Sequence, residues 1–447
     1  MPESPSQLVR LLTSIIFIGL CIFTVLMPIP LAGNRIWALS LLQLGIYVLC
    51  MLQACVYLIS PPRGIQWRHF LWFSPLLLLL VYIAAQRYLP NLIISPDLSA
   101  LDIALAKTSM LVAWVWLLLC QLTSSTAITR FGWAIVISGA AQACYAVVLQ
   151  LIDAPYSPII GMDEQGKARG SFVYQNHFAN YVVLCICIGL GLLLAELSSK
   201  QLKLTWRQLG RLLIETMLSK KLILRLCLVL MVLGLVMSHS RMGNAAFFAA
   251  LFTVSLIAIL GGYKRPPTFL KPLVVSILVL DVLIIGSMFG IEKLQQRYQE
   301  TSFSSEARDE IDLDALKLVT QHWSTGTGAG SFYSVFPQAQ SQLYHGFYDH
   351  AHNDYLQFAI ELGVPVTLCL WLWLAALAWR FFQTMRQHEL KLARGVCFAG
   401  LMALLFMGLH CTVDFMLQAP ANILLFLSIL VIAKQSDTLA ASHARGR

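Results

Sequence analysis

The chain has 447 residues, of which 58% are hydrophobic and 12% are charged, and its formal net charge is +9. Apolar runs of about 18 residues or more recur along its whole length, and each is long enough to cross the hydrocarbon core of a bilayer. This composition excludes a soluble globular protein. The basic residues fall mainly in alternate short loops, which membrane topology explains better than nucleic-acid binding does.

The first apolar run, Leu11 to Leu31, lacks a small-residue cleavage site and is followed at once by another run. We therefore expect it to be the first transmembrane helix and not a signal peptide. The eleven cysteines lie within or at the edges of apolar runs, and no C-x-x-C occurs. They are interpreted as small hydrophobic residues in the membrane, not as a disulfide framework.

Hydropathy predicts an all-α integral membrane protein with about twelve transmembrane helices and one long loop between helices nine and ten. The expected spans are 10–32, 36–59, 70–88, 102–121, 131–152, 178–196, 221–238, 243–262, 272–290, 356–379, 395–412 and 419–434. We expect residues 1–447 to form a single polytopic membrane domain, with a catalytic loop at 291–355 within it.

The positive-inside rule sets the orientation. With the N-terminus in the cytoplasm, about two thirds of the basic residues fall in cytoplasmic segments, so both termini are predicted to be cytoplasmic and the long loop exterior. One such segment, Lys200 to Lys221, has apolar residues at helical spacing and is expected to lie as an amphipathic helix on the inner leaflet.

Within the long loop, Leu313 to Val319 is expected to form a short helix, and Gly326, Gly328 and Gly330 to mark an irregular turn. No Lys-Ser or Lys-Thr follows these glycines and no strand pattern precedes them, so a phosphate-binding loop is not predicted.

Three exterior segments carry the polar residues. The loop after the fifth span holds Arg169 and Asn176, the turn after the seventh holds Ser240 and Arg241, and the long loop holds the remaining candidates, among them Arg297, Arg308, His350 and His352. Arg241 lies on the side where the positive-inside preference disfavours it. Its side chain either extends to lipid headgroups or belongs to a functional site. The polar residues next to it favour the functional site.

His350 and His352 have three interpretations. They could bind a metal with Asp349 or Asp354, cap the following helix, or supply a general base near neutral pH, and the last is favoured. Asn353 and Asp354 also suit the N-cap of the tenth span. Arginines near a histidine on a membrane face suit a reaction in which a lipid pyrophosphate leaves and a hydroxyl attacks, because guanidinium groups bind phosphates bidentately.

Four motifs carry a family resemblance. They are GSFVYQNHFA (170–179), SRMG (240–243), ARDEI followed by GTGAGSF (307–332), and HAHNDYLQ followed by ELG (350–363). In this order, each on the predicted exterior face, they resemble the O-antigen ligase and polymerase family of bacterial membrane glycosyltransferases, which use lipid-linked glycans.

The resemblance implies inverting, metal-independent transfer of a glycan from undecaprenyl pyrophosphate to an acceptor hydroxyl, at the periplasmic face of the bacterial inner membrane and without a cofactor. By motif, Arg241, Arg308 and Arg169 are expected to bind the pyrophosphate, His352 to act as the base and His350 to support it. Supporting roles fall to Asn176, Asn353, Asp354 and Ser240. Relatives often have an apolar residue where this chain has Asp312, so Arg297 is an alternative to Arg308.

The resemblance leaves the acceptor open. Lipid A core, as in an O-antigen ligase, is favoured over a growing glycan, as in a polymerase, and over a protein hydroxyl. The expected partners are therefore the lipid-linked donor, one of these acceptors and membrane lipids, and not nucleic acid.

A twelve-span transporter or flippase is the alternative from another class, but charges are scarce at the centres of the spans, with Asp281 the main exception. A non-catalytic scaffold would not need Arg241, Arg308 and His352 on one face.

Overall fold

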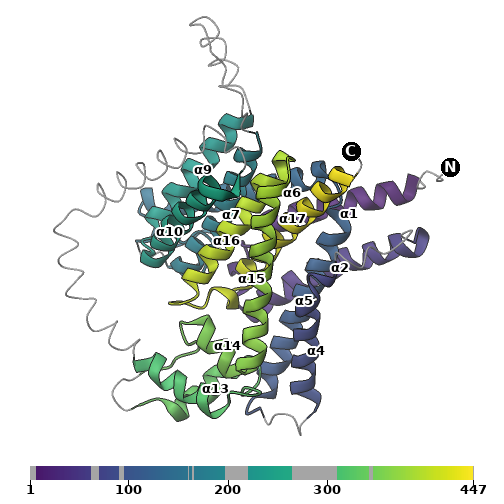
Figure 1. Cartoon of the computed structure of the whole chain (residues 1–447). Coiled ribbons are helices and arrows are strands. Elements are labelled where there is room, and N and C mark those ends of the chain that lie inside the picture. The colour runs from purple at the N-terminus through teal and green to yellow at the C-terminus, as the bar shows by residue number, and fades with distance from the viewer. Residues whose placement is uncertain are drawn as a thin grey trace, which may run out of the picture.

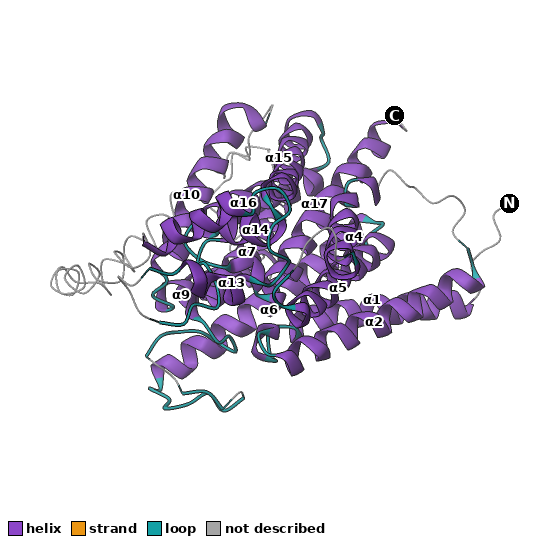
Figure 2. Ribbon diagram, turned by 90° about the horizontal axis from the view of Figure 1, so that it is seen from below, coloured by secondary structure: helices purple, strands orange, loops and turns teal. Residues whose placement is uncertain are grey.

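The computed structural model describes residues 7–61, 70–89, 95–159, 161–163, 166–196, 220–263, 310–341 and 346–445. Within these ranges the chain is helical and contains no strand, as predicted (Figures 1 and 2). The long helices are α1 (Gln7–Leu26), α2 (Ile36–Ile59), α4 (Ser74–Tyr88), α5 (Leu98–Gln121), α6 (Ser125–Leu151), α7 (Gln175–Glu196), α9 (Lys220–Met237), α10 (Arg241–Ile257), α15 (Val364–Gln387), α16 (Lys391–His410) and α17 (Pro420–Arg445).

Nine of the helices in the described ranges are long and apolar enough to cross a membrane. Helix α4 has 15 residues and is shorter, and α9 begins with two lysines and carries Arg225. The chain is thus a multi-pass membrane protein. The predicted ninth span, 272–290, and the basic stretch up to residue 219 lie outside the described residues, so the number of twelve spans stays a prediction.

Helix α7 is the centre of the bundle. Helices α6, α9, α10, α16 and α17 all pack around it, and from His177 to Leu194 each of its residues is buried. The contact with α16 is close because two glycines face each other: a Cβ atom on Gly191 would lie 2.7 Å from the carbonyl oxygen of Gly395. Small residues of this kind let membrane helices approach through their backbones.

One end of the bundle carries the polar residues, and we call it the polar end. There α7 and α17 begin and α16 ends: the Asn422 side chain of α17 donates to the carbonyl of His177 in α7, and the side chains of Asn180 and His410 lie 3.1 Å apart. The short helices α13 (Phe332–Ala339) and α14 (Asp354–Leu362) lie in the lower part of Figure 1, whereas α1 begins and α17 ends above them.

The structure corrects the predicted tenth span, 356–379. The chain forms α14 and then α15, with a break at Gly363, whose φ of 81° belongs to the left-handed region that favours glycine. The backbone of residue 324 leaves no space for a side chain here, because a Cβ atom on Gly363 would lie 2.7 Å from the Ser324 carbonyl oxygen. The membrane-length helix therefore begins at Val364.

The long loop packs on α14. Its helix over 310–321 includes the predicted short helix, and the three glycines of the predicted turn all have positive φ. The turn covers the end of α14, because Thr327 N donates to the Ile360 carbonyl at 2.8 Å and Gly328 N to that of Glu361 at 3.0 Å. The amide of Gln86 in α4 also donates to the Glu361 carbonyl. Both predictions within the loop are confirmed.

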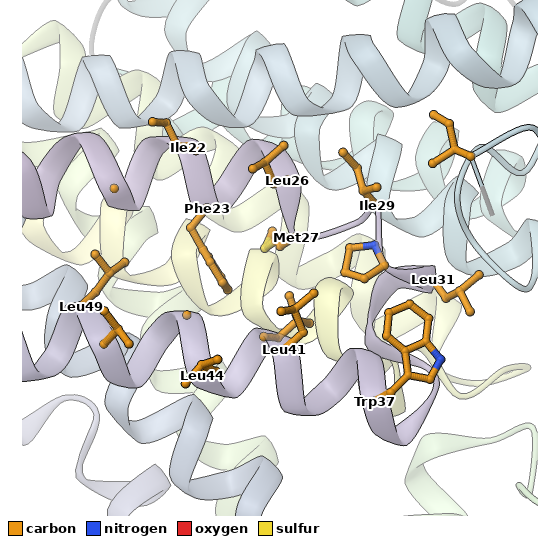
Figure 3. Close-up of a pocket in the computed structure, with 16 residues that line it drawn as sticks. Ile22, Phe23, Leu26, Met27, Ile29, Leu31, Trp37, Leu41, Leu44 and Leu49 are labelled. Atoms are coloured by element: carbon orange, nitrogen blue, oxygen red, sulfur yellow. The ribbon is translucent and has the colours of Figure 1, made fainter.

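An apolar groove of about 840 Å³ lies between α1 and α2 (Figure 3). Ile22 and Phe23 of α1 line it, together with Leu41 and Leu44 of α2. Ile22, Leu41 and Leu44 are exposed in the isolated chain, so the groove faces outward from the bundle and, in a membrane, towards lipid.

Candidate active site

Asp414 is the centre of the site. It lies in the connection between α16 and α17 at the polar end, and it is only 4% exposed. Its Oδ1 lies 3.2 Å from Nδ1 of His352, and its Oδ2 accepts a hydrogen bond of 2.7 Å from the Asn176 side chain. Three segments that are far apart in the sequence thus meet at one carboxylate.

The surroundings of Asp414 favour its charged form. Burial raises the pKa of this carboxyl, but the hydrogen bond with His352 and the neighbouring imidazoles of His177 and His410 outweigh burial and hold the pKa below its usual range. An ionised carboxylate beside an imidazole fixes the orientation and the tautomer of the ring, so that the proton lies on the nitrogen facing the carboxylate. The second ring nitrogen of His352 is then able to accept a proton.

The backbone places His352 just before α14. Its φ is 52°, in the left-handed region, which histidine enters more readily than most residues but which still carries strain. The next residue, Asn353, returns to extended backbone, and its side chain accepts hydrogen bonds from Tyr355 N and Leu356 N. The prediction of an N-cap is thus confirmed for Asn353, and His352 is left for another role.

Asp354 is the first residue of α14 and does not cap it. It is completely buried, its backbone N donates to the Cys411 carbonyl, and its Oδ2 accepts from Leu417 N at 2.9 Å. These bonds join α14 to the connection that carries Asp414. Burial raises the pKa of Asp354 to about 7, and the hydrogen bonds from Leu417 and Cys411 offset only part of that rise.

His350 belongs to a second chain of hydrogen bonds. Its Nδ1 lies within 3.2 Å of the Gln357 amide, and Gln357 donates to Oε1 of Glu361 at 3.0 Å. Burial is the main cause that lowers the pKa of His350, to about 4, so the ring is neutral at neutral pH. His350 and His352 therefore have different partners, although only one residue separates them.

The ring of Phe415 stands between these histidines. His350 stacks on it with ring centres 4.2 Å apart, whereas His352 and His177 meet it edge to face at 4.9 and 4.8 Å. Within the described ranges, no three His, Cys, Asp or Glu side chains are grouped as a metal site would require. The arrangement suits proton transfer by an imidazole held against a carboxylate.

Arg241 lies beside the start of α7. It is the first residue of α10, whose N-cap is Ser240, with Oγ accepting from Gly243 N at 3.2 Å. A Cβ atom on Gly243 would lie 3.0 Å from Cβ of Ala179, so the start of α10 packs one helical turn from Asn176. Both predicted residues of this turn thus lie at the polar end.

Arg169 lies next to the same turn, because Ala168 N donates to the carbonyl of Met237 at 3.0 Å. It is buried, and its guanidinium donates to the carbonyl of Asp163. Arg308 and Arg297 lie outside the described residues. The structure therefore brings His352 and Asn176 together at Asp414, with Asn353 next to His352 in the chain and Arg241 and Arg169 along the same end.

Sequence reasoning missed Asp414. A signal was present, since Thr412-Val413-Asp414 forms a short polar break between the two last predicted spans, on the side predicted to be exterior. The predicted candidates came from three other exterior segments, 153–177, 239–242 and 291–355. His410 was missed because it lies at the end of a span.

A bundle of membrane-length helices with a buried carboxylate–imidazole pair at one end defines a multi-pass membrane protein with a candidate acid–base site. Residues 226–371 match the family described as O-antigen ligase. The resemblance to the O-antigen ligase family is thus confirmed over these residues, which make up about a third of the chain. The matched range includes Arg241, Arg308 and His352, while Asn176 and Asp414 lie outside it. No curated protein matches the chain.

Proposed function

We propose that the protein transfers a glycan from undecaprenyl pyrophosphate to an acceptor hydroxyl at the periplasmic face of the bacterial inner membrane. The observation that supports this most directly is the contact between Nδ1 of His352 and the buried carboxylate of Asp414. His352 takes the proton of the acceptor hydroxyl through its other ring nitrogen, and Asp414 stabilises the imidazolium that forms.

The bond changes are those of an inverting substitution. The acceptor oxygen forms a bond to the anomeric carbon while the bond from that carbon to the pyrophosphate oxygen breaks. Undecaprenyl pyrophosphate leaves with the electron pair, and its charge needs cations close by. Arg241, Arg308 and Arg169 supply guanidinium groups for this purpose, and Arg169 lies next to the turn that carries Arg241. The proposal involves no metal and no cofactor.

The apolar groove between α1 and α2 suits the polyprenyl chain (Figure 3). Pro30 and Leu31 line one end of it, and Asn34, three residues further on, contacts His177 at the polar end. A chain in this groove would therefore lead from the membrane to the neighbourhood of the site.

Transfer to lipid A core, as in an O-antigen ligase, is the proposed reaction. It is tested with purified protein, the lipid-linked glycan and lipid A core in the presence of EDTA, comparing the wild type with His352→Ala. We expect transfer by the wild type alone, with donor binding retained in the variant. Lengthening of the donor glycan in place of transfer would identify a polymerase. If neither reaction occurred, a protein acceptor and then transport would be tested.

A further inference from the structure

A polar cavity lies on the other side of Phe415 and His350 from Asp414. A space of about 170 Å³ is lined by Asn34 and Arg35, by Lys107 of α5, and by His350 and Phe415. A second space of about 310 Å³ continues from it and also has Lys107 and His350 in its lining. We call the two together the Lys107 cavity. The proposed reaction leaves it without a role.

Two cations line this cavity: Lys107 lies within it, and Arg35 is exposed at its rim. In the part of the chain that the structure describes, neither Lys107 nor Arg35 makes a side-chain hydrogen bond or an ion pair. Lys107 is half-buried within a membrane-length helix, where an ammonium group is costly and marks a functional position by default. The Nε2 of Gln418, which lines both spaces, is also buried without an acceptor among the described residues.

The acidic groups of the cavity do not supply the missing acceptor. Glu361 attracts Lys107 electrostatically but forms no ion pair with it in the described part of the chain, and its carboxylate accepts hydrogen bonds from Gln357 and from the backbone of Gly330 and Phe332. Asp349 is exposed at the rim. The first residues of α2 and α17 also line the smaller space, and the start of a helix carries partial positive charge. Inside the cavity, the donors that have no acceptor in contact are thus the Lys107 ammonium and the Gln418 amide, next to the carboxylate of Glu361.

The cavity and Arg241 lie on opposite faces of α7. The start of α10 packs on Ala179, whereas Asn34, beside Arg35, contacts His177. Residues two positions apart in a helix point about 200° apart, so the two cationic regions flank α7, with Asn176 and Asp414 between them. An inverting transfer needs the donor and acceptor sites on opposite sides, because the acceptor must approach the anomeric carbon from the side opposite the leaving pyrophosphate.

We propose that the Lys107 cavity binds a phosphate group carried by the acceptor, and so positions the acceptor hydroxyl next to His352. This inference rests on the proposed transfer reaction and adds to it the chemistry of the second substrate, a phosphorylated glycolipid. Lys107 and Arg35 are binding residues here, and they contact a part of the acceptor away from the reacting atoms.

The test is a binding measurement that needs no turnover. The full chain in nanodiscs is titrated with lipid A core that carries its phosphates and with the same material after phosphatase treatment. We expect the wild type to bind the phosphorylated form about ten-fold tighter or more, as a charge-assisted hydrogen bond implies. Lys107→Met should abolish this preference, and Lys107→Arg should keep most of it.

Two controls separate the possible failures. Arg87→Met removes a cation that is already paired with Asp102 on the surface of α4, and it should keep the full preference. Binding of undecaprenyl pyrophosphate should be the same in Lys107→Met as in the wild type. Equal binding of both acceptor forms by the wild type, or a loss of donor binding instead, would overturn the inference. Intact phosphate preference without glycan transfer would refute the proposed function alone.

Discussion

Replacing Asp414 with asparagine tests the proposed base most directly. The substitution keeps the size of the side chain and removes its charge. Both oxygens of Asp414 now accept hydrogen bonds, from Phe415 N and from Asn176, while Oδ1 also lies against His352. Because Phe415 N donates to Oδ1, the asparagine keeps its carbonyl oxygen there and places its NH₂ at Oδ2, where the Asn176 amide can turn to accept. His352 then keeps its tautomer, and the variant loses only the negative charge that stabilises the imidazolium.

The size of the effect follows from the contact. Two unit charges about 4 Å apart interact by ~4 kcal/mol at an effective dielectric constant of about 20. Because the His352 side chain is 35% exposed, solvent screening reduces this to ~2–3 kcal/mol for the imidazolium that forms during transfer. That corresponds to a roughly 30- to 150-fold lower kcat. We therefore expect the kcat of Asp414→Asn to fall by about this factor.

The assay is reconstituted glycan transfer at saturating donor and acceptor, with donor binding measured separately. Asp414→Asn should bind the donor as the wild type does. Combined with His352→Ala it should be no less active than His352→Ala alone, because the two residues act as one unit. An Asp414→Asn variant with a kcat within about three-fold of the wild type would refute the assignment of the pair.

Three further outcomes are expected. Arg241→Ala should lose most transfer activity, and Arg241→Lys should recover only part of it, because an ammonium cannot bind a phosphate bidentately. A fully active lysine variant would contradict bidentate binding by Arg241. Because burial raises the pKa of Asp354 to about 7, the stability it contributes is present at low pH and is lost as the pH rises through that value. The Tm of Asp354→Asn should therefore fall less than that of the wild type between about pH 6 and pH 8, and an equally steep fall would be evidence against a raised pKa. Gly326→Ala should lower the free energy of unfolding, measured by thermal unfolding in detergent, by about 2 kcal/mol or more. The reason is that the φ of Gly326 is 75° and a Cβ atom there would lie 2.4 Å from the Glu361 carbonyl oxygen. Unchanged stability would show that the turn can move away from α14.

The sequence predicted the membrane helices well because apolar length is a local property. It also predicted the N-cap at Asn353 and the glycine turn, since both depend on residue type at one position. The predicted start of the tenth span, residue 356, was wrong because of packing between residues that are far apart in the sequence. The residues of α14 are apolar enough to continue α15, but Ile360 packs against Phe332 and Phe336 of the long loop, so these apolar groups face protein in place of lipid.

The site was predictable only in part. His352 and Asn176 followed from their motifs, but their meeting at Asp414 depends on how α7 and α16 pack. Residue type and spacing alone do not distinguish the two histidines of HAHND, and only the family resemblance assigned the base to His352. The structure distinguishes them, because the ring of Phe415 lies between them and gives each a different hydrogen-bond partner.

The geometry of the site at Asp414 also depends on the facing glycines of α7 and α16, which lie towards the other end of the bundle. Gly191 lies 15 residues after Asn176 in the same helix, roughly 22 Å away along its axis, and Gly395 lies near the start of the helix that leads to Asp414. A larger side chain at either glycine would push α7 and α16 apart at this end and change the angle between them. The hydrogen bond between Asn176 and Asp414 would then be altered by a substitution that never approaches the substrate.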